Sequence, residues 1–287
     1  MFFLNKKKDK EKIYGRTKKV MLFTNARNEK NIKEWAAHHL LIGFDLIVIF
    51  DHLSKYPLKY VFDPFDKRVK IIPCFHSNPV KIPLMNAAIS IAKQCKVDWF
   101  IYIDADEYII LNKYEGVKKM LNNYPFAHSI SLNWVLFGTN NYVKDPPGLV
   151  IENYTKSQEN LDQHVKTFVR PNEIKYSVNP HYYNMKNMTK CYNIDRKIMD
   201  PEKGYAFHKN PILFEKADAF IAHYIYQSEE TYIQRKILLS QDDTGTMREK
   251  DPNLHNYYND INNDIPKQKY SSNIKKFLAQ YKSKYNL

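Results

Sequence analysis

The chain of 287 residues is long enough to bury a full hydrophobic core, as one large domain or two small ones. Its formal net charge of +13 indicates an anionic partner, while its apolar and charged fractions are those of a globular protein. Three widely spaced cysteines without a Cys-x-x-Cys motif argue against a disulfide framework or a zinc site and favour a reducing compartment.

The chain begins with a basic arm that leads into a strand, a loop and a helix. Residues 1–17 are lysine-rich, and their apolar start is too short for a signal peptide. Residues 19–24 are predicted as the first strand, and a helix is expected to follow with Asn28 as its N-cap and Glu29 in its first turn. A loop between a strand end and a helix start can hold a nucleotide. His38 and His39 on this helix are predicted to be structural.

The first hundred residues alternate between apolar strands and helices. Residues 45–50 and 69–73 read as strands, and residues 83–95 read as a helix. Asp51 follows the second strand, where it could accept hydrogen bonds from a nucleoside or cap a turn. This alternation predicts an α/β fold with a mostly parallel central sheet.

An acidic cluster follows the most apolar of these strands, residues 99–103. Asp104, Asp106 and Glu107 come directly after it, at the edge of the sheet where open α/β folds bind ligands. If the chain stays extended there, Asp104 and Asp106 point to the same side and repel each other unless a cation lies between them. We therefore expect a divalent ion, Mn²⁺ or Mg²⁺, that also binds a diphosphate.

The second half of the chain supplies further elements and candidate groups. Helices are predicted over 115–123 and 228–240, strands over 129–137, 164–170 and 220–224, and a loop over 184–212. Residues 241–287 read as a polar C-terminal extension. Near its end an amphipathic helix is expected to dock on the protein body, with an anionic membrane surface as the alternative. No apolar stretch is long enough to span a bilayer, so we expect a cytoplasmic protein with, at most, peripheral membrane contact.

The ordered series of motifs resembles the family 2-like and family 92-like glycosyltransferases. The likeness covers residues 18–240 and rests on Asn28-Glu29, Phe50-Asp51, the acidic cluster after residue 103, Trp134 with Phe137-Gly138, and His223-Tyr224. It implies a GT-A fold with a mostly parallel sheet flanked by helices. It also implies a nucleotide-sugar donor, a divalent metal that is commonly manganese, and a glycan or glycoconjugate acceptor.

The resemblance also assigns roles to particular positions. Asp104 and Asp106 match the Asp-x-Asp metal motif, Asp51 matches the acidic position that contacts the nucleoside, and His223 matches a further metal ligand. The first nucleotide loop corresponds to Ala26, Arg27, Asn28 and Glu29. The second loop lacks the glycine-rich Asp-Gly-Ser turn of simple family 2 members, so the family 92-like branch fits better.

An inverting transfer, the outcome we expect, needs a base near the acceptor hydroxyl. Glu152 and His181 are the favoured candidates, ahead of Asp145 and Asp195. Three basic residues are candidates to neutralise phosphate charge, with a role as solvated surface groups as the equal alternative, namely Arg27, Lys166 and Arg170.

Two other functions compete with glycosyl transfer. A nucleotidyltransferase also places paired carboxylates at a sheet edge, but the sequence has no glycine-rich loop for a triphosphate. A non-enzymatic basic module that binds polyanions would show steep salt dependence. Because the basic residues are not clustered with aromatic ones, we expect no nucleic-acid partner.

Overall fold

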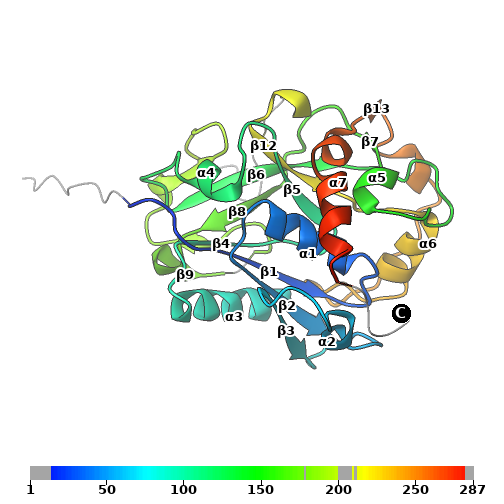
Figure 1. Ribbon diagram of the computed structural model, residues 1–287, viewed down its shortest axis with the longest axis horizontal. Helices are drawn as coiled ribbons and strands as arrows, with labels where there is room; N and C mark the ends of the chain where they lie inside the picture. Colours follow the sequence, from blue (N-terminus) through cyan, green and yellow to red (C-terminus); the bar gives the residue numbers. More distant parts are fainter. Residues whose placement is uncertain (1–13, 178, 200–208, 210–211, 282–287) are drawn as a thin grey trace, which may run out of the picture.

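The computed structural model describes residues 14–177, 179–199, 209 and 212–281 (Figure 1). Its centre is a large mixed sheet, in which most strand pairs are parallel, and helices flank it. The strand order is β3-β2-β1-β4-β8-β6-β12-β5, and β11 pairs with β6 off this path. The strands of this sheet are β1 (Val20–Ala26), β2 (Leu46–His52), β3 (Val69–Cys74), β4 (Trp99–Tyr102), β5 (Glu107–Leu111), β6 (Ser129–Leu136), β8 (Val165–Val169), β11 (Cys191–Asn193) and β12 (Ala219–His223).

The parallel half of the sheet confirms the α/β prediction. β1 pairs in parallel with β2 on one side and with β4 on the other, and β2 pairs in parallel with β3. The carboxyl ends of these strands therefore lie along one edge, which is where open α/β sheets place their ligand crevice. β1 and β4 have no exposed residue, as expected for strands covered on both faces.

The other half of the sheet contains antiparallel pairs, which the sequence did not indicate. β8 runs antiparallel to both β4 and β6, and β12 is antiparallel to β5 but parallel to β6. Because β8 runs against β4, the start of β8 lies near the carboxyl end of β4. Lys166 consequently lies at the ligand edge of the sheet, and Arg170 lies beyond the opposite end of the same strand.

Helices cover both faces of the parallel half. Alternate residues of β1 belong to two hydrophobic cores, with Val20 and Leu22 in one and Met21 and Phe23 in the other. The first core is covered by α1 (Ile32–Leu41) and α7 (Ile265–Leu278), which lie side by side, and the second by α3 (Lys81–Gln94) (Figure 1).

The predicted amphipathic helix is α7, and it docks on the body of the protein. Its Ile274 is fully buried, and the Tyr270 hydroxyl accepts a hydrogen bond of 3.0 Å from the backbone N–H of Leu111. Phe277 packs against Phe65 with ring centroids 5.9 Å apart. Within the described residues, no helix has the length and apolar character needed to cross a bilayer.

The remaining elements are short. They are α2 (Leu58–Val61), α4 (Val117–Leu121), α5 (Val150–Asn153), α6 (Glu229–Tyr232), a π-helical turn (Ile233–Ile237), 3₁₀ turns (Pro171–Glu173, Met188–Lys190, Phe214–Lys216, Leu254–Asn256) and the small strands β7 (Lys156–Ser157), β9 (Ile174–Tyr176), β10 (Asn184–Met185) and β13 (Ile261–Asn262).

Three local predictions are wrong. The first helix begins at Ile32 after Asn31, whereas Asn28 has a left-handed φ of 59° and is not its N-cap. The predicted loop over 184–212 contains β10 and β11, although residues 200–208 and 210–211 lie outside the described part. The predicted helix over 228–240 has its N-cap at Ser228 as expected, but it becomes a π-turn after Tyr232.

Candidate functional site

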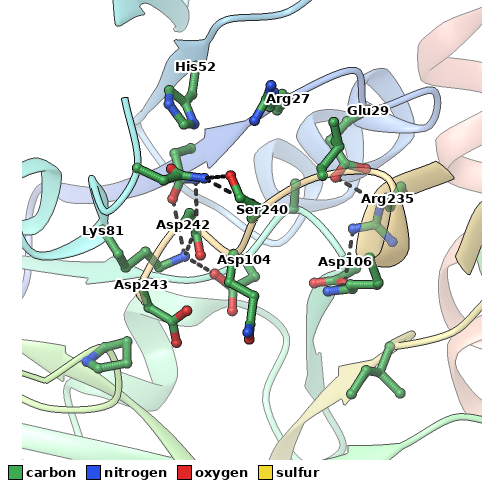
Figure 2. Close-up of a pocket in the computed structure, with 18 of the residues that line it drawn as sticks. Arg27, Glu29, His52, Lys81, Asp104, Asp106, Arg235, Ser240, Asp242 and Asp243 are labelled. Atoms are coloured by element: carbon green, nitrogen blue, oxygen red, sulfur yellow. Dashed lines mark hydrogen bonds and ion pairs between the residues drawn. The ribbon is translucent and has the colours of Figure 1, made fainter. Parts of the chain in front are cut away.

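A pocket of about 260 Å³ lies at the edge where β1, β2 and β4 end (Figure 2). Its charged lining has six cationic and five carboxylate side chains, namely Arg27, Lys81, Lys166, Arg235, Lys236 and Arg248 with Glu29, Asp104, Asp106, Asp242 and Asp243. Trp134, His181 and His223 also line it. The pocket thus brings together Asp104 and Asp106 of the acidic cluster, Arg27 and Glu29 of the first loop, and the predicted ligand His223.

Asp104 is held by two buried lysines. Lys166 Nζ lies 3.0 Å from Asp104 Oδ2, and Lys81 forms an ion pair with Asp104 Oδ1. Burial alone would raise the pKa of Asp104, but Lys166 and Lys81 outweigh it and hold this pKa below its ordinary value. The side chain keeps 30% exposure, so Asp104 is an ionised group at the pocket wall.

Asp106 has a separate set of partners. Arg235 Nη2 and Lys236 Nζ each lie 3.0 Å from Asp106 Oδ2. Arg235 also donates from Nε to Glu29 at 2.9 Å, so the first loop is tied to the π-turn. Burial opposes the ionisation of Asp106, but Lys236 and Arg235 outweigh it and hold its pKa well below the ordinary value.

The two aspartates do not converge on one point, contrary to the sequence expectation. The chain turns at residues 105–106 instead of staying extended, and Glu107 N–H closes this turn by donating to the Asp104 carbonyl at 3.1 Å. Asp104 consequently lies beside Lys81, whereas Asp106 lies beside Arg235 (Figure 2). Among the described residues, no three His, Cys, Asp or Glu side chains are arranged to hold a metal ion.

The second carboxylate oxygen of Asp106, Oδ1, faces the ring of His223. His223 Nε2 lies 3.6 Å from Asp106 Oδ1, and neither buried atom has a hydrogen-bond partner among the residues that the structure describes. Burial lowers the pKa of His223, so its ring is neutral at pH 7 and suited to metal coordination. Asp106 Oδ1 and His223 Nε2 therefore fit as two ligands of a cation whose other ligands come from substrate oxygens and water, as is usual for Mg²⁺.

Glu107 is the buried third member of the acidic cluster. Its side chain has no exposed surface, and Oε2 accepts a hydrogen bond of 2.8 Å from the backbone N–H of Asp104. Burial raises the pKa of Glu107 to about 8, although Lys166 opposes this rise. Glu107 thus braces the turn that carries Asp104 and does not line the pocket.

The two predicted bases lie in different places. His181 lines the pocket, its ring centroid is 5.3 Å from that of Trp134, and its Nδ1 lies 3.0 Å from the Val165 carbonyl oxygen. Burial and the nearby Lys166 lower the pKa of His181 to about 3. Glu152 does not line the pocket, because it lies on α5 and forms an ion pair of 2.7 Å with Lys275 of α7.

Only some of the predicted nucleotide-binding residues line the pocket. Arg27 and Glu29 line the pocket, whereas Ala26 is buried in β1. Asn28 ties the loop to the end of β2, since its Oδ1 accepts from the Lys55 N–H at 2.7 Å. Asp51 also does not line the pocket, and its Oδ2 accepts from Leu58 N–H at 2.8 Å, at the start of α2.

Several lining residues were missed by the sequence analysis. Arg235 and Lys236 were placed on an ordinary helix, and Asp242, Asp243 and Arg248 were placed in the C-terminal extension. Asp242 accepts from Asn25 Nδ2 at 2.7 Å and lies 3.2 Å from Lys81 Nζ. One feature of the sequence could have indicated carboxylates near Lys81. This lysine is the first residue of α3, where the helix dipole disfavours a cation unless carboxylates are close.

Comparisons with known proteins leave the family open. No family model matches the chain, and no curated protein matches it. Among solved structures, the crystal structure of HddC from Yersinia pseudotuberculosis matches with a TM-score of 0.35 and 9% sequence identity, over 61% of this chain and 90% of that chain. A likeness this weak carries no conclusion about fold family or function.

Proposed function

We propose that the protein is a metal-dependent glycosyltransferase that moves a sugar from a nucleotide-diphosphate sugar to a hydroxyl acceptor. The observation that carries this proposal is the buried pair of Asp106 Oδ1 and His223 Nε2, in a pocket at the carboxyl ends of parallel strands. The two atoms lie 3.6 Å apart and have no hydrogen-bond partner within the described part of the chain. The surplus of cationic over carboxylate side chains in the lining favours an anionic substrate.

Each group in the pocket then has a distinct task. A bound Mn²⁺ or Mg²⁺, held by Asp106 and His223, would act as a Lewis acid that stabilises the departing diphosphate. Arg27 and Arg248 line the pocket, have no carboxylate partner among the described residues, and would bind phosphate oxygens. Lys81 and Lys166 keep Asp104 ionised and fixed at the wall, where it can accept hydrogen bonds from the donor.

Trp134 supplies an apolar surface on the acceptor side. Its ring is stacked on His164 at 5.0 Å between centroids and lies 4.5 Å from the ring of His223. Aromatic faces of this kind suit the apolar faces of sugar rings. Of the two bases considered, only His181 lines the pocket, and its low pKa makes it a neutral imidazole at pH 7.

The test is a screen of nucleotide sugars for thermal stabilisation and for manganese-dependent hydrolysis or transfer. A donor at 100 times its dissociation constant should stabilise the protein by about 2.7 kcal/mol. We expect this stabilisation to require the metal, to disappear in a chelator and to be lost in His223→Gln. Binding that is indifferent to chelator and to His223→Gln, or turnover of nucleoside triphosphates instead, would contradict the proposal.

A further inference from the structure

A second cationic pocket lies at the opposite edge of the sheet. It measures about 290 Å³ and is lined by residues of the first described segment, of the turn after α4 and of the end of β8, namely Tyr14, Gly15, Arg16, Thr17, Leu121, Asn122, Pro125 and Arg170. Arg170 in the second pocket is four positions after Lys166 in the first, which is roughly 13 Å along an extended strand.

Arg170 is a buried cation without a carboxylate partner. The residue is 5% exposed and forms no ion pair within the described part of the chain. Its guanidinium lies between two aromatic rings, 3.6 Å from the centroid of Tyr14 and 4.1 Å from that of Trp99. These cation–π contacts offset part of the cost of burying the charge, yet burial still lowers the pKa of Arg170 to about 10.

The aromatic rings leave only the edges of the guanidinium available. On one edge, Nε donates to the Ala127 carbonyl at 2.9 Å. The terminal nitrogens on the remaining edge have no acceptor within the described residues, and Arg170 is one of the residues that line the pocket. Two parallel N–H donors in the plane of a guanidinium are the arrangement that binds an oxyanion in a bidentate manner.

The charges around this edge favour an anion with more than one negative charge. Arg16, which is exposed, lines the same pocket and adds a second guanidinium. Two carboxylates lie near Arg170 and raise its pKa, but both have other partners. Asp98 accepts from the backbone N–H groups of Lys18 and Lys19, and Glu173 accepts from the Tyr14 hydroxyl at 2.6 Å.

We propose that the pocket of Arg16 and Arg170 binds a phosphate monoester, with the Arg170 edge holding two of its oxygens. A phosphate monoester carries close to two negative charges at pH 7 and three acceptor oxygens, which two guanidinium groups match. The pocket volume is at the small end of the range for ligand sites. This chemistry has two sources, a soluble phosphate ester and a lipid headgroup, which the vesicle experiment below distinguishes. The site is separate from the first pocket and does not depend on the proposed transferase activity.

The test follows the Arg170 Nε–H resonance by NMR while inorganic phosphate is added to the full chain at constant ionic strength. We expect saturable shifts that Arg16→Gln weakens by about tenfold, as loss of one charge-assisted contact implies. Arg248→Gln removes an exposed arginine from the first pocket and is the matched control, which should leave this titration unchanged. An unmoved Arg170 resonance, an equal effect of both variants, or an equal response to acetate would overturn the proposal.

Vesicles distinguish the two sources of the phosphate. Sedimentation with phosphatidylcholine vesicles that contain phosphatidic acid, weakened by Arg16→Gln and by free phosphate, would assign the site to a lipid headgroup. Phosphate binding without vesicle binding would assign it to a soluble phosphate ester. Because Arg170 is buried, Arg170→Lys is used only if circular dichroism shows that it folds, and it should lose the bidentate contact.

Discussion

Replacing Asp106 with Asn is expected to destabilise the protein even without any ligand. Asp106 is 1% exposed and lies 3.0 Å from both Arg235 and Lys236, so the change leaves two cations without this carboxylate. Breaking a buried ion pair from one side costs about 3–5 kcal/mol. Arg235 retains Glu29 at 2.9 Å and Lys236 is 19% exposed, so we expect the lower end, about 3 kcal/mol.

Urea denaturation in the presence of a chelator measures this loss. With a slope of about 3 kcal/mol per molar urea, the midpoint should fall by about 1 M. Asp243→Asn is the matched control, because Asp243 lines the same pocket, is exposed and has no ion pair among the described residues. That variant should stay within about 0.5 kcal/mol of the wild type. An Asp106→Asn protein as stable as the wild type would refute the view that these cations depend on Asp106.

Two further predictions concern parts of the fold outside the pocket. Burial raises the pKa of Glu34 to about 7, so the folded chain binds the Glu34 proton more tightly than the unfolded chain does. Protonation of Glu34 therefore stabilises the fold. This contribution is full below about pH 4.5 and is lost as the pH rises through 7. Urea titrations from pH 4.5 to 8 should show that Glu34→Gln removes this part of the pH dependence, and an unchanged profile would contradict the pKa. Ile274 of α7 is fully buried against the body, so Ile274→Ala should cost about 2–5 kcal/mol by thermal or urea unfolding, whereas exposed Lys276→Ala should cost less than about 0.5. Equal losses of stability in these two variants would mean that the docking of α7 does not depend on the burial of Ile274.

The parallel half of the fold could be predicted because its signals are local. Runs such as residues 99–103 are uniformly apolar, which is the pattern of a strand covered on both faces. The buried state of His38 and His39 was also predictable from their place on the inward face of α1, and both are fully buried. The antiparallel pairing of β8 with β4 left no such trace, because the direction of a strand depends on distant connections.

The site was predictable in its acidic cluster and in Arg27 and Lys166, but not in Arg235 and Lys236. Asp104 and Asp106 stand out after an apolar strand, whereas Arg235 and Lys236 look like the polar side of a surface helix. Adjacent residues on an α-helix do not face the same point, so nothing in the sequence suggested that both contact Asp106. They do so from a π-turn, a form of helix that is frequent at functional sites.

The first pocket is closed by a contact between segments about 160 residues apart. The backbone N–H groups of Val80 and Lys81 both donate to the Asp242 carbonyl at 2.8 Å. During translation, β1 to β4 leave the ribosome long before Asp242 has been made. A nascent chain that has not passed this residue therefore cannot have the complete pocket, however well its first strands have paired.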